Sequence, residues 1–269
     1  MFLGIGSYTF PWAVGADGFN DKGKLTAMSI LHMAAASDIR YVQFGDNLPL
    51  HLFPQDALVL LKQKAGELGI RIETGTRGLT KKNILQYLNI AEHMQSPFLR
   101  IVIDDGLFEP GVAEVTATIK TVLPFLRDKN IQLAIENHDR FPAAVLEQII
   151  LATDTDYVAI CLDTANSIGS GESIRETVSI LAPYTVNLHL KDILIKRAEH
   201  KMGFIVEGIA AGDGMLDIPW IINQLLPYNK CKTAILECWS NPEATMEATL
   251  VKEKQFAGKS IEYLKTILL

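Results

Sequence analysis

A chain of 269 residues with 48% hydrophobic and 21% charged residues has the composition of a soluble globular protein. Its formal net charge of -6 gives no basic surface for a phosphate backbone, so we expect no nucleic-acid partner. The first residues lack the basic start of a secretion signal, and no apolar stretch is long enough to span a membrane. We therefore expect a cytoplasmic protein with no membrane contact.

Short β-branched or aliphatic runs alternate with segments of helical pattern along the whole chain. Eight runs predict strands: 2–7, 41–44, 70–74, 98–103, 131–136, 157–163, 185–190 and 233–238. Helices are predicted at 24–36, 55–68, 81–93, 112–127, 143–151, 172–181, 218–226 and 243–268. This alternation predicts parallel βαβ units. Since no linker interrupts them, we expect a single (β/α)₈ TIM barrel domain over 1–269. A doubly wound sheet is the alternative, but GxGxxG is missing after the first strand.

Residue parity in the last four strands predicts which side chains face the barrel interior, because neighbouring side chains point to opposite faces. The large aliphatic parity is expected outside, under the helices: Ile131, Leu133, Ile135, Val158, Ile160, Leu162, Val186, Leu188, Leu190, Ala234 and Leu236. The other parity is expected inside: Gln132, Ala134, Glu136, Ala159, Cys161, Asp163, Thr185, Asn187, His189, Thr233, Ile235 and Glu237. The interval 192–232 is the longest between strands, and we expect a functional loop there over the barrel mouth.

Each of the four inward rows ends in a residue that can bind a metal, namely Glu136, Asp163, His189 and Glu237. These ends meet at the C-terminal face, where TIM barrels place their active sites. Three carboxylates and one imidazole suit one divalent metal ion, whether Mn²⁺, Mg²⁺, Co²⁺ or Zn²⁺. Singly, each residue has a plainer interpretation, such as a helix cap or a buried core histidine. Their coincidence on four consecutive strands favours a metal site.

Five short motifs carry a resemblance to a known family. They are AIEN at 134–137, CLDTAN at 161–166, NLHLKD at 187–192, GDGMLD at 212–217 and LECW at 236–239. In order and spacing they resemble the sugar phosphate isomerase/epimerase family with the xylose isomerase-like TIM barrel. The resemblance covers essentially the whole chain and implies that Glu136, Asp163, His189 and Glu237 are the metal ligands. It further implies that Glu136 and Glu237 are catalytic and move the substrate proton.

The resemblance implies a divalent-metal-dependent sugar isomerase or epimerase that acts on a ketose or sugar derivative through a metal-bound enediolate. A decarboxylase or lyase of a 3-oxo sugar acid is the alternative, because loss of CO₂ leaves the same enediolate. An endonuclease is less expected, since the second and third strands end without histidine. A non-catalytic sugar-binding protein would leave two carboxylates beside the metal unexplained. The expected partner is a small-molecule sugar or sugar acid, and a homo-oligomer is compatible with the sequence.

Residues beyond the strand ends are candidates for substrate binding. His138 and Lys191 lie two residues after Glu136 and His189, so continued strand geometry aims both at the mouth. Lys191 or Arg197 would hold a substrate carboxylate or phosphate, although surface ion pairing is the alternative for both.

Three further residues complete the candidate substrate site. Tyr8 and Trp239 follow the first and last strands and would form an apolar wall beside the metal, with core packing as the alternative. Asn166 occupies a position where epimerases of the family often have a substrate-binding histidine. That departure favours the decarboxylase alternative slightly.

Three charged residues fall on the inward parity of the third and fourth strands: Arg71, Glu73 and Arg100. Bare charge inside a barrel is unfavourable, so we expect them to form ion pairs with one another.

Overall fold

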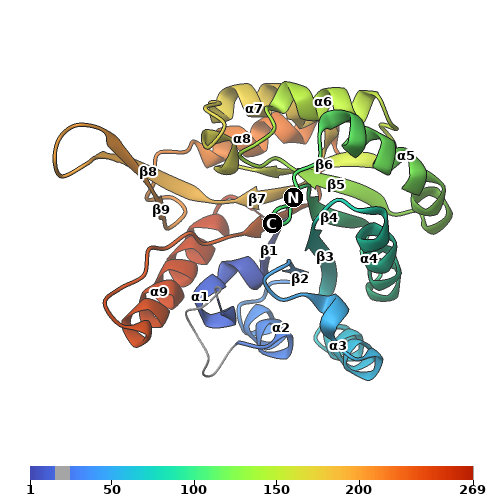
Figure 1. The fold of residues 1–269 in the computed structure, drawn as a ribbon. Helices are drawn as coiled ribbons and strands as arrows, with labels where there is room; N and C mark the ends of the chain where they lie inside the picture. The colour runs from blue at the N-terminus through green and yellow to red at the C-terminus, as the bar shows by residue number, and fades with distance from the viewer. Residues whose placement is uncertain (16–24, 269) are drawn as a thin grey trace.

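Eight parallel strands close into a barrel, which confirms the predicted TIM barrel (Figure 1). The computed structural model describes residues 1–15 and 25–268. The wall strands are β1 (Phe2–Gly6), β2 (Tyr41–Phe44), β3 (Arg71–Arg77), β4 (Phe98–Val102), β5 (Gln132–Glu136), β6 (Val158–Asp163), β7 (Thr185–Leu190) and β10 (Thr233–Leu236). Around the barrel they follow chain order, and β10 pairs with β1 to close it.

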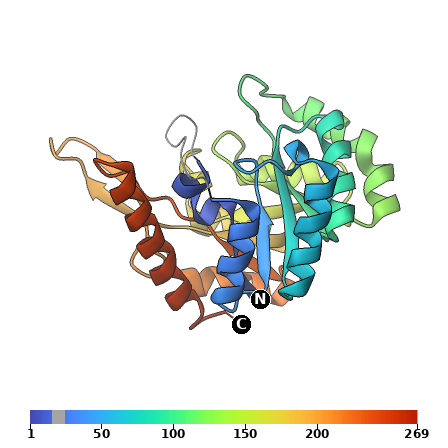
Figure 2. The same cartoon turned by 90° about the horizontal axis from the view of Figure 1, so that it is seen from below.

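Helices surround the barrel on its outside, and the two chain ends lie close together in both views (Figures 1 and 2). The α-helices are α1 (Pro11–Val14), α2 (Ala27–Ala36), α3 (Gln55–Glu67), α4 (Lys81–Met94), α5 (Val112–Lys129), α6 (Ala143–Leu151), α7 (Ile174–Leu181), α8 (Ile218–Leu225) and α9 (Met246–Leu264). Lys24, where the helix predicted at 24–36 begins, lies outside the described residues. No described helix combines the length and apolar character that a membrane span needs.

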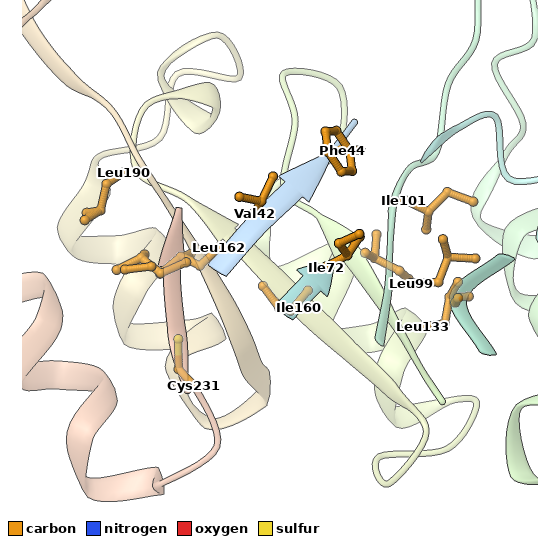
Figure 3. Packing of buried hydrophobic residues seen from close by; sticks show 14 of the residues in the cluster. Val42, Phe44, Ile72, Leu99, Ile101, Leu133, Ile160, Leu162, Leu190 and Cys231 are labelled. Atoms are coloured by element: carbon orange, nitrogen blue, oxygen red, sulfur yellow. The ribbon is translucent and has the colours of Figure 1, made fainter. Parts of the chain in front are cut away.

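The main hydrophobic core lies between the strand wall and the helices. Ile101, Leu133 and Ile160 have no exposed surface and belong to this layer (Figure 3). They lie on the aliphatic parity of their strands, so the alternation of residue types along each strand gives the barrel wall an apolar outer face. Burial of each such side chain contributes roughly 1.5–3 kcal/mol to stability.

The start of β7 departs from the predicted parity. Between β6 and β7 the register shifts: Ile160 pairs with Thr185, but Cys161 pairs with Asn187. The extra residue, Val186, therefore turns inward and packs with Cys161 and Phe98 in a small interior cluster. Thr185 instead donates its hydroxyl to the Leu181 carbonyl, 2.9 Å away. The predicted orientations of Val186 and Thr185 are wrong because the β-bulge shifts the alternation by one residue before Asn187.

The predicted ion pairing among the charged residues of β3 and β4 is also wrong. Arg71 is exposed at the N-terminal end of the barrel. Arg100 lies level with Gly75, two residues above Glu73, and its long side chain extends toward the C-terminal end to reach Glu136. Glu73 consequently has neutral partners in the barrel interior.

The interval 192–232 forms regular structure rather than a simple loop. A hairpin of β8 (Asp192–Arg197) and β9 (Phe204–Ile209) projects away from the barrel (Figure 1), and α8 follows it. The Asp192 carboxylate stabilises the base of the hairpin, because it accepts hydrogen bonds from the backbone N–H groups of Gly212 and Gly214, each at 3.0 Å. A side chain at Gly214 would place its Cβ 2.0 Å from Asp192 Oδ1, so the GDGMLD motif requires glycine there.

Candidate metal centre

The structure brings the four predicted ligands together at the C-terminal end of the barrel. Glu136, Asp163 and His189 come from the ends of β5, β6 and β7, and Glu237 directly follows β10. All four are buried. Ligand atoms of Asp163, His189 and Glu237 all lie within 4.8 Å of one another. Glu136 and His189 form a second such group with Cys161, which lies on the predicted inward parity of β6.

The two ring nitrogens of His189 have different surroundings, and these define the orientation of the ring. Nε2 lies 2.6 Å from the Gln43 Oε1 acceptor, which places the proton on Nε2. Nδ1 lies 3.1 Å from Glu136 and 3.0 Å from Glu237, yet it is buried and makes no hydrogen bond with any described residue. A nitrogen lone pair facing two carboxylates is the donor set of a cation site, so these residues fit a divalent metal.

The electrostatic environment of His189 also favours a bound cation. Burial alone would lower the pKa of His189, but the carboxylates of Glu237 and Glu136 outweigh it and raise that pKa above its ordinary value. The pocket therefore favours positive charge at Nδ1.

The turn after β6 fixes Asp163. Its Oδ1 accepts the backbone N–H groups of Ala165 and Asn166 at 2.8 and 2.9 Å. The Asn137 side chain accepts the Asp163 N–H at 2.7 Å and donates to its carbonyl at 2.9 Å. These contacts leave Oδ2 directed into the site, where it meets Lys191.

Lys191 Nζ lies between two of the candidate ligands. It is 2.6 Å from Asp163 Oδ2 and 2.9 Å from Glu237 Oε2. Burial alone would lower the pKa of Lys191, but these two carboxylates raise it above its ordinary value. Lys191 is therefore an ammonium group whose protons point into the centre.

Arg100 forms a buried ion pair with Glu136, through Nε to Oε2, and a second one with Asp46 at 2.7 Å. Burial alone would raise the pKa of Glu136, but the Arg100 guanidinium, followed by His189, holds it well below its ordinary range. Glu136 is thus strongly biased toward the carboxylate form.

The charges of the centre nearly balance. Four carboxylates, those of Glu136, Asp163, Glu237 and Asp46, face three cations, those of Lys191, Arg100 and Arg77, so one negative charge remains. A divalent ion would turn this into one positive charge. An anionic substrate or intermediate would be favoured in such a site.

A cavity of about 590 Å³ opens beside the centre. Five of the predicted substrate residues line it, namely Tyr8, His138, Asn166, Lys191 and Trp239.

Asn166 is tied directly to the candidate ligands. Its Nδ2 donates to Glu136 Oε1 at 2.9 Å, and its Oδ1 accepts from Lys191 at 3.3 Å. Tyr8 is held by its hydroxyl, which donates to Asp46 at 2.9 Å. Trp239 is 47% exposed at the cavity, so core packing does not explain it.

The structure does not bring Arg197 to this cavity. It lies at the outer end of β8, where its guanidinium stacks over the Phe204 ring and donates to the Lys201 carbonyl at 3.0 Å. The strand that follows Lys191 leaves the barrel as a hairpin, which carries Arg197 outward.

Sequence reasoning missed two partners of the centre. Gln43, on β2, and Asp46, just beyond it, both reach the site through side chains. Gln43 lies on the inward row of β2, and Asp46 comes shortly after the end of that strand, which was the available signal. Neither residue type by itself indicates a metal site.

The family follows from comparison with known proteins. Residues 31–267 match the family model described as xylose isomerase-like TIM barrel. The chain belongs to that family.

Three similar proteins illustrate its range. The 3-oxo-isoapionate decarboxylase of Pectobacterium atrosepticum is 30% identical over 266 residues, covering 99% of this chain and 96% of that protein. The structure of D-psicose 3-epimerase with D-tagatose from Clostridium cellulolyticum H10 has a TM-score of 0.75 at 13% identity, covering 99% and 98% of the two chains. A xylose isomerase-like TIM barrel protein from Mycobacterium smegmatis in complex with magnesium has a TM-score of 0.70 at 11% identity, covering 98% and 97%. Sequence relatives and structural neighbours thus include enzymes of different reaction types.

Proposed function

We propose that this protein is a divalent-metal-dependent decarboxylase of a short 3-oxo sugar acid. The observation that carries the proposal is the buried ion pair between Arg100 and Glu136. An epimerase that uses two carboxylates needs a base that readily accepts a proton. Glu136, with its pKa held well below the ordinary range, is a poor base. Decarboxylation needs no base, because the bond that breaks is C–C rather than C–H.

Four residues would hold the metal: Glu136, Asp163, His189 and Glu237. When bound, the ion would supply Lewis acidity toward a substrate carbonyl. In this proposal Glu136 is a ligand whose charge Arg100 stabilises. This role differs from the sequence-based expectation that Glu136 moves the substrate proton.

Lys191 would supply the proton that completes the reaction, because a divalent ion held by Asp163 and Glu237 would offset the two carboxylates that raise the Lys191 pKa. When the bond between the carboxyl carbon and C2 breaks, its electron pair moves to C2, C3 and the C3 oxygen, and CO₂ leaves. The resulting enediolate takes a proton at C2 from the Lys191 ammonium, which lines the cavity. Lys191 then recovers a proton from water at the cavity mouth. The product is a ketose one carbon shorter.

The cavity lining favours an unphosphorylated substrate. Among the residues that line it, Lys191 is the ammonium group and is already paired with Asp163 and Glu237, while His138 Nδ1 lies 2.5 Å from Asp139 Oδ1. The exposed Trp239 ring offers an apolar place for the carboxylate that leaves. A firm salt bridge would stabilise that carboxylate in the ground state and oppose its loss.

The full-length similarity to 3-oxo-isoapionate decarboxylase supports this choice of reaction class. Ketose isomerisation or epimerisation is the second candidate, favoured by one observation. Glu136 and Glu237 both lie close to His189 Nδ1, at 3.1 and 3.0 Å, so the centre holds the pair of carboxylates that a two-carboxylate mechanism would use.

A side-by-side assay separates the two chemistries. The metal-loaded enzyme is incubated in D₂O with a panel of ketoses, and separately with freshly prepared 3-oxo sugar acids. We expect CO₂ from a 3-oxo acid and no deuterium in recovered ketoses. Deuterium exchange into a ketose without CO₂ from any acid would favour the second candidate and refute the first.

A further inference from the structure

Beneath the metal centre, a hydrogen-bonded chain runs into the barrel interior from His189. Gln43 Oε1 lies 2.6 Å from His189 Nε2, and Gln43 Nε2 donates to Glu73 Oε2 at 3.2 Å. Gln43 also donates to Asn187 Oδ1 at 3.0 Å. All four side chains are almost completely buried, with exposed fractions of 4% or less.

The orientation of the Gln43 amide decides which nitrogen of His189 carries the proton. With the oxygen facing His189, Nε2 must be the donor, and the Nδ1 lone pair is left for the metal. If the amide turned over, its NH₂ group would face Nε2. His189 would then have to accept there, and its proton would move to Nδ1, where it would block metal binding.

Two of the neighbouring groups are amides, and the bond between Gln43 and Asn187 would survive if both turned over together. Asn187 donates to Thr233 Oγ1 at 2.8 Å, a hydroxyl that can also donate, so reversal would cost Asn187, besides its contact with Glu73, only its longer contacts with the Thr233 carbonyl at 3.5 Å and the Cys161 thiol at 3.2 Å. Glu73 cannot reverse, because an ionised carboxylate only accepts hydrogen bonds. It accepts from Gln43 at 3.2 Å, from Asn187 at 3.4 Å and from Thr233 at 2.7 Å.

The position of Glu73 is otherwise unfavourable. Burial raises its pKa to about 7, although the hydrogen bonds from Thr233 and Gln43 oppose the shift. Protonation would not reverse the chain, because a proton on Oε1 could be donated to the Thr233 hydroxyl while Oε2 still accepts from the amides. An apolar residue would fill this space without the desolvation penalty.

We propose that Glu73 is a positioning residue for the metal centre. Its carboxylate fixes the Gln43 amide, and Gln43 in turn fixes His189 with Nδ1 free to bind metal. This inference rests on the proposed metal site, but it assigns a role to a residue that touches neither metal nor substrate.

Metal affinity provides the first test. Chelator-treated protein is titrated with MnCl₂ by calorimetry for the wild type, Glu73→Met, Glu73→Gln and Gln43→Met. Loss of groups that support metal ligands typically weakens metal binding by about 10–100-fold, and we expect that loss for Glu73→Met and Gln43→Met. Glu73→Gln should bind nearly as tightly as wild type, because its amide oxygen accepts from Gln43 while its NH₂ donates to Thr233.

A matched control and a spectroscopic readout separate positioning from general destabilisation. Ser260→Ala removes a buried hydroxyl on α9 that accepts the Ala211 N–H at 2.9 Å and donates to the Phe256 carbonyl at 2.8 Å, away from the chain described above. It should lower stability while leaving the Mn²⁺ affinity unchanged. In ¹⁵N spectra of histidine-labelled metal-free protein, recorded at alkaline pH where His189 carries a single proton, His189 Nε2, assigned by its absence in His189→Gln, should be protonated in wild type and Glu73→Gln. In Glu73→Met it should lose that proton.

The outcomes distinguish this inference from the proposed function. Wild-type protein that binds no Mn²⁺ would count against the metal site, whatever the tautomer. Tight binding by folded Glu73→Met, with Nε2 still protonated, would overturn the role of Glu73 and leave the metal site intact.

Discussion

Replacing Glu73 with glutamine should change how the stability of the protein depends on pH. Burial raises the Glu73 pKa from 4.5 to about 7 in the folded protein. Between these two values the unfolded chain releases the proton while the folded protein keeps it, so folding stability falls as pH rises. This loss of folding stability is absent below pH 4.5 and complete above about pH 7. It amounts to roughly 3 kcal/mol.

The measurement is urea unfolding of metal-free wild type and Glu73→Gln at several pH values from 5 to 8. The variant lacks the titrating group, so its stability relative to wild type should increase by most of that roughly 3 kcal/mol over this range. Glu262→Gln, at an exposed position on α9, is the control and should show no such trend. A Glu73→Gln difference that stays constant with pH would show that Glu73 does not titrate in this window and would refute the reasoning.

Three further predictions follow from individual contacts. Arg100→Met leaves Glu136 buried without its guanidinium and should lower the free energy of unfolding by about 3–5 kcal/mol in urea; an unchanged value would contradict the buried pair. Lys191→Met should reduce kcat for decarboxylation by about 10²–10⁴-fold, and a normal kcat would remove Lys191 as proton donor. Gly214→Ala should lower the melting temperature and activity, because its Cβ would lie 2.0 Å from Asp192, whereas Gly258→Ala on α9 has no atom within 4 Å and should be tolerated. Equal behaviour of the two glycine variants would contradict the packing argument for the hairpin base.

The barrel and the gathering of the ligands were predictable because both depend on periodicity. Strand alternation places Glu136, Asp163 and His189 inside, and parallel strands bring their ends to one face. The same reasoning failed at Val186, where one extra residue reverses the parity. A bulge of this kind leaves no mark in the hydrophobic pattern.

The partners of the charged residues were not predictable, because they depend on how far each strand is shifted relative to its neighbours. Arg100 has Glu73 below it and Glu136 above it, and only the register shows which carboxylate it reaches. The prediction that Arg197 binds substrate failed for a different reason. Its distance from Lys191 along the chain is short, but the hairpin carries it out of the cavity.

The most direct test of the proposed chemistry follows a single carbon. A 3-oxo sugar acid labelled with ¹³C in its carboxyl group is given to the metal-loaded enzyme in D₂O, and the label is followed by NMR. We predict one labelled CO₂ or bicarbonate for each substrate consumed, with one deuterium on the carbon that was C2 of the acid and is C1 of the ketose product, and no turnover after chelation. Consumption of the acid with the label still bonded to carbon would contradict decarboxylation at this centre.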